Sequence, residues 1–455
     1  MKKVFNVLLP VLKGFLYGAI ILQVVLGILY IGNQFLRVPQ FRETIVYLEM
    51  TEQFVMDEYT GLLYPMLVKI CYGLFSSFYY IPIYLLQMTA GLFCVYHFVC
   101  AFTEKRLQAV ICALWINTIP FVAQMHVSVL PHALAFACLV LMLSEVIKAT
   151  VYKRPLLFIE WTVLLCSFTI LSQLTKGYLW VGVLLLLWAV VLQFYAQLQK
   201  GLTCLVTALI CIGIIVCNLA IYHSTETAGY YGRIQNTPQA MFFQRTAVPI
   251  LSEKYMIYMP SEIRECFTGE ELALFHRYPY KVQTEMGPVL EVRFGKERAA
   301  EIYVELGLLG LDVAAKENLS RYIEDVVYYA FPHLAYVSWR DGDVKGMTSW
   351  NYQQFTGENA VLSIYYFNIC HNIWLIDLCF TGIGFLVLAW QHRRLYVRVW
   401  LPVVLFLLIY GAFLALRGSG MYDYKLALLP MAIGYAPMCC MLFLKRPMKT
   451  EWRDI

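Results

Sequence analysis

Four carboxylates between residues 49 and 59 follow the first apolar run of the chain. Two of them, Asp57 and Glu58, are adjacent; Tyr59 follows directly, and a Tyr64-Pro65 pair comes shortly after. A positioned carboxylate can act as a general base and remove the proton of an acceptor hydroxyl. A transferase that works at a bilayer surface needs such a group. The stretch therefore indicates Asp57, with Glu58 as the second choice, as a proton acceptor, and Tyr59 and Tyr64 as substrate contacts.

Basic side chains in other outer connections are candidates to hold the phosphate of a lipid-linked substrate. Arg binds phosphate oxygens through a planar fork, and Lys binds them as a compact charge. The candidates in the predicted outer connections are Lys69, Lys176, Arg417 and Lys425.

Each of these residues also has a simpler interpretation. Asp57 and Glu58 are equally suited to the solvated face of an interfacial helix. Arg417 and Lys425 flank a Gly-Ser-Gly turn and can be snorkelling anchors. Lys176 lies in a very short connection between two apolar runs, where a charge is costly unless it reaches water or a partner.

The elements that must position these residues are membrane spans. The chain has 455 residues, of which 60% are hydrophobic and 14% charged, and its mean hydropathy is +0.63. A water-soluble protein of this size does not need so high a hydrophobic fraction to form its core. The sequence therefore predicts an all-α, polytopic membrane protein.

Runs of about 20 apolar residues are long enough to cross the hydrocarbon layer. The first run follows Lys2 and Lys3 but is too long for a signal peptide, and no small-residue cleavage site is evident after it. Ten spans are predicted, near residues 8–31, 80–102, 107–125, 127–148, 156–174, 178–198, 202–222, 372–391, 398–416 and 426–444.

Positive charge sets the predicted orientation. With the N-terminus inside, 15 Lys and Arg residues lie at the inner ends of the spans and six lie outside. Since Lys and Arg favour the cytoplasmic side, both termini are predicted to be cytoplasmic. This result requires an even number of spans, and one misassigned hairpin would change ten to eight or twelve. The predicted location is the cytoplasmic membrane, which the chain crosses many times.

Three parts of the chain follow from this topology. Residues 1–222 form an N-terminal membrane module with the first outer loop at 32–79, residues 223–371 an extracytoplasmic cap, and residues 372–455 the last membrane helices. The cap holds 18 of the 30 acidic residues and 13 basic ones, so it is hydrated. Its aromatic residues suit the membrane interface, or stacking against sugar rings.

Within the cap, apolar residues recur at helical spacing in two places. The sequence predicts short helices from Lys296 onward and over residues 317–327. The Asp341-Gly342-Asp343 stretch predicts a polar turn, because the ligand pattern of a calcium loop is not completed.

Several classes of chemistry have no local support. The chain has no Walker loop, dinucleotide fingerprint, nucleophile elbow or HExxH motif, and its eight histidines do not cluster at metal-ligand spacing. Most of the 14 cysteines lie in or beside apolar runs, which argues against a disulfide framework; one bridge between Cys266 and Cys370 stays open. Glu145 and Glu160, near predicted inner span ends, are expected to be hydrated or paired with Lys148 and Arg154.

The start of the chain resembles that of GT-C type integral membrane glycosyltransferases, such as the protein mannosyltransferases and the aminoarabinose transferases. The features that carry the resemblance are one span, an outer segment with Asp57-Glu58-Tyr59 and Tyr64-Pro65, and Tyr80-Ile81-Pro82-Ile83-Tyr84-Leu85-Leu86-Gln87 opening the second span. The resemblance in sequence motif is limited to residues 52–87. The chain departs from better-known members in its large insertion after the seventh span and in having no long C-terminal soluble domain.

The resemblance implies a reaction. Such enzymes use polyprenyl-phosphate-linked sugars and invert the anomeric centre, with a catalytic acidic residue in the first outer loop, here Asp57. The implied partners are the lipid-linked donor, membrane lipids and a glycan, lipid or protein acceptor; nucleic acid is not expected, and a monomer is the default. No cofactor is assigned, and assistance by a divalent metal stays open. The alternative function is a transporter or flippase of a lipid-linked substrate, with intramembrane charges lining its path.

Overall fold

The computed structural model describes residues 2–35, 61, 63–100, 106–152, 154–174, 179–196, 206, 208–217, 246–277 and 282–330, and a few isolated positions, among them Phe242, Phe243 and Tyr366. All regular secondary structure in these ranges is helical, which confirms the predicted all-α class. The predicted spans at 372–391, 398–416 and 426–444 lie outside the described residues, so the total of ten stays a prediction.

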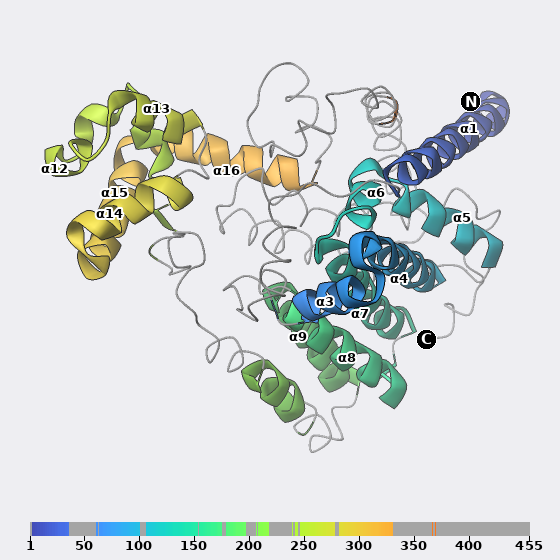
Figure 1. The fold of residues 1–455 in the computed structure, drawn as a ribbon. Coiled ribbons are helices and arrows are strands. Elements are labelled where there is room, and N and C mark those ends of the chain that lie inside the picture. Colours follow the sequence, from blue (N-terminus) through green and yellow to red (C-terminus); the bar gives the residue numbers. More distant parts are fainter. Residues whose placement is uncertain are drawn as a thin grey trace.

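One group of helices forms a bundle (Figure 1). Its elements are α1 (Lys2–Phe35), α3 (Leu63–Phe75), the 3-10 turn η1 (Ser76–Phe78), α4 (Tyr80–Cys100), α5 (Arg106–Asn117), α6 (Pro120–His126), α7 (His132–Tyr152), α8 (Phe158–Leu174) and α9 (Leu179–Ala196), followed by a further apolar helix at Ala208–Cys217.

Three of these helices are long and apolar enough to cross a membrane: Tyr17–Phe35, Tyr80–Cys100 and His132–Ala149. They coincide with the first, second and fourth predicted spans. α8 and α9 are also apolar, but the described apolar helices at these positions are shorter, Phe158–Leu174 and Val181–Phe194. The composition and the helix lengths of the chain are therefore those of a membrane protein.

The third predicted span, at 107–125, is not one helix. α5 contains 12 residues and is about 18 Å long at 1.5 Å per residue, too short to cross the hydrocarbon layer. The break has a local cause: Pro120 cannot donate a backbone hydrogen bond, and it forces Ile119 into an extended conformation (φ −61°, ψ 132°). The chain then restarts as the seven-residue α6.

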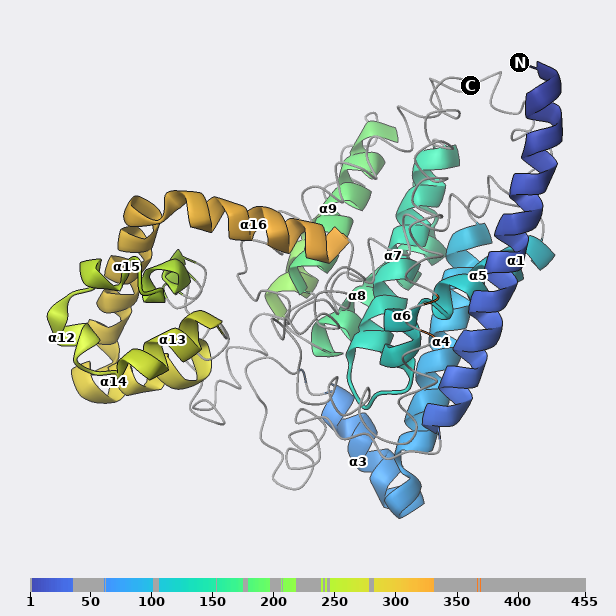
Figure 2. The same cartoon turned by 90° about the horizontal axis from the view of Figure 1, so that it is seen from above.

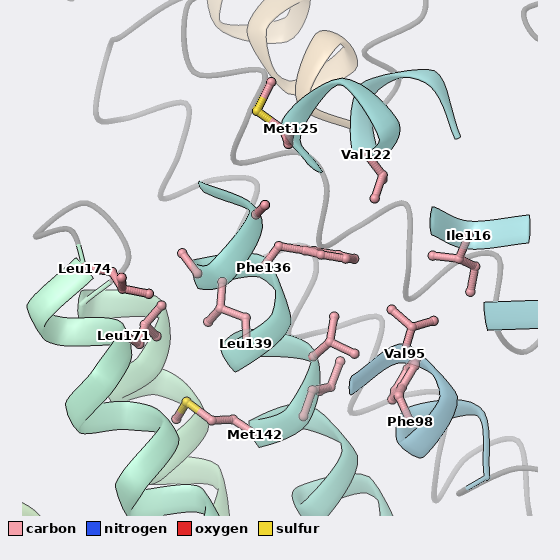
Figure 3. Close-up of a cluster of buried hydrophobic side chains, with 14 of the residues drawn as sticks. Val95, Phe98, Ile116, Val122, Met125, Phe136, Leu139, Met142, Leu171 and Leu174 are labelled. Atoms are coloured by element: carbon pink, nitrogen blue, oxygen red, sulfur yellow. The ribbon is translucent and has the colours of Figure 1, made fainter. Parts of the chain in front are cut away.

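The core of the bundle surrounds α7. This helix packs against α4, α8, α9 and α6, and 72% of its apolar window is buried, against 33% for the window in α1. Figure 3 shows side chains of five helices meeting there; those labelled are Val95, Phe98, Ile116, Val122, Met125, Phe136, Leu139, Met142, Leu171 and Leu174. α6 therefore contributes to the same core as the long helices.

Two ion pairs lie at the end of α7 and the start of α8. Lys148 Nζ donates to Glu145 Oε1 (3.2 Å), and Arg154 binds Glu160 through two hydrogen bonds of 2.6 and 2.8 Å. These are the expected pairs. The acidic partners are buried rather than hydrated, since Glu145 is 3% and Glu160 7% exposed.

A second group of helices, the cap unit (residues 246–277 and 282–330), has a hydrophobic core of its own. Its elements are η3 (Val248–Leu251), η4 (Met256–Tyr258), α12 (Ser261–Arg264), α13 (Gly269–Arg277), the π-helical η5 (Val282–Met286), α14 (Gly287–Phe294), α15 (Lys296–Val313) and α16 (Ala315–Ala330). In both views α12–α15 lie apart from the bundle, whereas α16 extends toward it (Figures 1 and 2), and Tyr322 of α16 packs against the bundle core.

The two helices predicted within the cap are confirmed as α15 and α16. Gly295, at φ +81°, separates α14 from α15, a conformation that glycine adopts without strain. Buried Asn318 of α16 donates to the carbonyls of Gly310 (2.8 Å) and Thr246 (3.1 Å), which joins three segments. The predicted turn at 341–343 lies outside the described residues. So does Cys370, while Cys266 carries a free thiol.

Charge fixes the start of α16 to the segment before η4. Glu317 Oε1 accepts hydrogen bonds from Tyr255 Oη (2.5 Å) and Lys254 Nζ (3.0 Å). These hydrogen bonds, that of Tyr255 above all, lower the pKa of Glu317 from 4.5 to about 2. The contribution to stability is thus present above pH 4.5 and is lost as the pH falls toward 2.

We expect Glu317→Gln to lower the thermal midpoint of the cap slightly at neutral pH, because the glutamine carries no charge. The difference from wild type should persist down to pH 4.5 and vanish near pH 2, where the wild-type carboxylate becomes protonated. Thermal unfolding followed by circular dichroism of the detergent-solubilised full chain measures it. A difference that is the same at both ends of this range contradicts the assignment.

Candidate functional site

Most of the predicted site residues lie outside the described part of the chain: Asp57, Glu58, Tyr59, Lys176, Arg417 and Lys425. Two are described, and both belong to α3. Tyr64 is fully buried, whereas the side chain of Lys69 is exposed. Lys69 follows Tyr64 by five positions in the helix, so the two side chains face different directions. The structure brings Tyr64, and not Lys69, into the bundle.

Tyr64 contacts a polar side chain of the second span. Gln87 of α4, which has no exposed surface, donates from Nε2 to Tyr64 Oη (3.2 Å) and to the carbonyl of Leu130 (2.9 Å). Leu130 lies in the non-helical stretch between α6 and α7. Gln87 therefore joins α3, α4 and the non-helical stretch after α6.

The chain enters this region at Gly61, which packs on the last turn of α8. A Cβ atom at Gly61 would lie 1.8 Å from the carbonyl oxygen of Gln173, so only glycine fits there. Gly61 follows Asp57 by four residues, and Lys176 follows Gln173 by three. The contact therefore brings together two backbone positions, one four residues after Asp57 and the other three residues before Lys176.

Polar side chains bind backbone carbonyls at the break between α5 and α6. The carbonyls of Leu114 and Trp115 already accept the backbone N–H of Thr118 (3.0 and 3.1 Å). Thr118 Oγ1 donates to the carbonyls of Leu114 (2.9 Å) and Trp115 (3.0 Å). Gln23, seven residues into the apolar window of α1, donates to Trp115 as well (3.3 Å). The hydroxyl of Tyr366 donates to the carbonyl of Thr118. Since Gln23 belongs to a membrane-length helix, the break lies at the depth of the spans.

Next to this break, His126 is held in one tautomer. Asn117 Nδ2 donates to the carbonyl of Ala113 (2.8 Å), so its oxygen faces the ring of His126 at 2.7 Å from Nε2. Nε2 must therefore carry the hydrogen, which leaves Nδ1 as an acceptor. His126 is 1% and Asn117 4% exposed.

Both side chains pack directly on the backbone of α4 at Gly91. A Cβ atom there would lie 2.4 Å from Cε1 of His126 and 2.7 Å from Oδ1 of Asn117. Gly91 follows Gln87 by one helical turn, so the two positions share a face of α4. Gln87, Asn117 and His126, which we call the polar cluster, thus lie against one strip of this helix.

A charged cluster lies nearer the other end of α4, at its interface with α7. His97 Nε2 lies 2.5 Å from Glu145 Oε1 and 2.5 Å from Lys148 Nζ. The side chain of Glu145 is 4% exposed and that of Lys148 16%. Ionisable residues within a membrane-spanning bundle are expensive and commonly functional.

In the part of the chain that the structure describes, no group of three or more His, Cys, Asp or Glu residues could hold a metal ion. No role for His126, Asn117 or His97 is predicted from the sequence. The available signal was the polar stretch Asn117-Thr118-Ile119-Pro120 inside an apolar run, which predicts a broken helix.

Comparisons of the chain with family models, with curated proteins and with solved structures find no match.

We expect Gly91→Ala to displace the His126–Asn117 pair and to destabilise the bundle by about 1–3 kcal/mol, because the added methyl group overlaps buried atoms. Thermal unfolding in detergent measures the loss. Gly73→Ala is the matched control: Gly73 is helical, lies in α3 and has nothing within 4 Å of its Cβ position, so its midpoint should not fall. Equal midpoints for the two variants contradict the packing described here.

Proposed function

We propose that the chain is an inverting glycosyltransferase that takes a sugar from a polyprenyl-phosphate donor and transfers it to a cell-envelope acceptor at the outer face of the cytoplasmic membrane. Asp57 is the general base, and Glu58 is the alternative. The proposal includes the GT-C type fold, ten spans and an extracytoplasmic cap.

The observation that carries the proposal is the contact of Gly61 with Gln173. The reaction needs a carboxylate and a cation around one substrate, and a chain rises by at most about 3.5 Å per residue. Four residues connect Asp57 to one side of this contact, and three connect Lys176 to the other. A base and a phosphate-binding group within reach of one point are what the chemistry requires.

The broken helix gives further support. Non-helical backbone at membrane depth is tolerated where protein buries it or where it lines a polar cavity, and broken helices commonly build binding sites. Here Gln87 links the non-helical stretch between α6 and α7 to Tyr64, through the carbonyl of Leu130. A neutral, hydrogen-bonding surface next to the outer segment suits a sugar.

The proposed step is a single displacement. The acceptor oxygen attacks the anomeric carbon while the bond from that carbon to the phosphate oxygen breaks, through a transition state with oxocarbenium character. The carboxylate of Asp57 takes the acceptor proton, and Lys176, with Arg417 and Lys425, balances the charge of the leaving lipid phosphate. Attack opposite the leaving group inverts the anomeric centre.

We expect Asp57→Asn to abolish sugar transfer from a polyprenyl-phosphate donor while donor binding and folding persist, because the amide cannot accept the proton. Transfer by the purified protein, with donor affinity and thermal midpoint measured in parallel, is the test. Glu58→Gln is the matched control and should retain transfer. If only Glu58→Gln is inactive, Glu58 is the base instead of Asp57. If neither substitution changes the rate of transfer, the proposed site is wrong.

The second candidate function, a transporter or flippase of a lipid-linked substrate, is favoured by the His97–Glu145–Lys148 cluster. This cluster places charged groups between two long apolar helices, where a transporter would use them.

We expect Glu145→Gln to retain sugar transfer per folded molecule if the chain is an enzyme, because the cluster lies at the opposite end of α4 from Tyr80 and Gln87. The variant should be less stable, since Lys148 keeps its charge without a carboxylate. Transfer assays and lipid translocation in proteoliposomes separate the two functions. Translocation by wild type that Glu145→Gln abolishes, without any sugar transfer, favours the transporter.

A further inference from the structure

Two buried acceptor atoms of the polar cluster have no hydrogen-bond partner in the described structure: Gln87 Oε1 and His126 Nδ1. Both side chains are almost completely buried, at 0% and 1% exposure. A buried acceptor without a donor loses its hydrogen bonds to water and gains nothing in return. Such groups in a native protein call for an explanation.

The hydrogen bonds around the two atoms fix their character. Gln87 uses its amide nitrogen twice, for Tyr64 and Leu130, so its oxygen remains. His126 donates through Nε2 to Asn117, so Nδ1 presents a lone pair. The two side chains are neighbours, because His126 packs on Gly91, one turn from Gln87 on α4. Neither atom can be satisfied by the other, since both are acceptors.

We propose that Gln87 and His126 form a hydroxyl-binding pair that recognises the sugar of the lipid-linked donor. The inference rests on the proposed function and specifies which part of the donor these residues contact. Two neutral acceptors match sugar hydroxyl groups, each of which donates one hydrogen. They do not match the donor phosphate, which is itself an anionic acceptor and needs cations.

The position of α6 explains how a sugar reaches a closed site. α6 is seven residues long, and a break flanks it on each side, at Thr118–Ile119 and at Val127–Pro131. Hinges of this kind, at the ends of an element, allow it to move as a unit. A shift of α6 opens the space between His126 and Gln87, and sugar hydroxyls then bind the two acceptors.

The test compares a lipid phosphate with and without a sugar. Affinities of the purified full chain are measured for undecaprenyl phosphate and for undecaprenyl-phosphate-linked glucose, mannose and arabinose. Wild type should bind at least one glycosylated lipid more tightly than the bare lipid. Gln87→Met and His126→Gln should each weaken binding of that lipid about fivefold, as loss of one neutral hydrogen bond does, and leave the bare lipid unaffected.

Matched variants separate recognition from folding. His126→Gln keeps an amide nitrogen near the position of Nε2 for Asn117 and removes the Nδ1 acceptor, whereas His126→Asn keeps an acceptor oxygen near Nδ1 and should restore the discrimination. Gln23→Met removes another buried glutamine, one that donates to Trp115, and should lower the thermal midpoint without changing the discrimination.

Three results overturn the inference. If wild type binds bare and glycosylated lipids with equal affinity, Gln87 and His126 do not recognise the sugar. If Gln87→Met and His126→Gln change only the thermal midpoint, the two acceptors hold a trapped water molecule. If wild type binds none of the lipids, the proposed function falls as well, which distinguishes that failure from the first two.

Discussion

A backbone carbonyl that leaves a helix inside a bilayer needs a donor from the protein, and this constraint governs the bundle. Pro120 has no backbone N–H to donate, and it ends the regular helix after α5 at the depth of the long spans. Lipid offers no donor there. The carbonyl of Thr118 accepts from the hydroxyl of Tyr366. Those of Leu114 and Trp115 accept the backbone N–H of Thr118 and, in addition, its Oγ1 hydroxyl, and that of Trp115 also accepts from Gln23 of α1. The broken helix therefore fixes which side chains of its neighbours must be polar.

The same requirement explains the two glycines beside the break. Gly27 of α1 faces Thr118, where a Cβ atom would lie 2.6 Å from the threonine side chain, and Gly91 of α4 faces His126 and Asn117. Hydrogen bonds of about 3 Å across helices need close approach of the backbones. Small residues permit that approach in membrane bundles. The hydrogen bonds to buried polar groups therefore depend on the close packing that these glycines permit.

Two polar clusters lie against opposite ends of α4. The neutral cluster of Gln87, Asn117 and His126 lies toward Tyr64, and the cluster of His97, Glu145 and Lys148, which contains an ion pair, lies toward the other end. Neutral acceptors suit sugar hydroxyls, whereas paired charges suit the membrane border, where headgroups and water reduce the cost of ionisation. This division favours placing the proposed sugar transfer at the outer end of the bundle.

Composition and periodicity determined much of this protein without a structure. The hydropathy of the chain predicted the all-α membrane class, the charge pattern predicted the pairs Lys148–Glu145 and Arg154–Glu160, and apolar spacing predicted α15 and α16, because each of these depends on neighbours in the sequence. Pro120 also marks the break in the run at 107–125, but the sequence does not show which distant side chains bind the carbonyls there. Tertiary structure alone decided such distant contacts. Only packing brings Gly61 onto Gln173 and His126 onto Gly91, since partners so far apart in the chain leave no mark on local spacing.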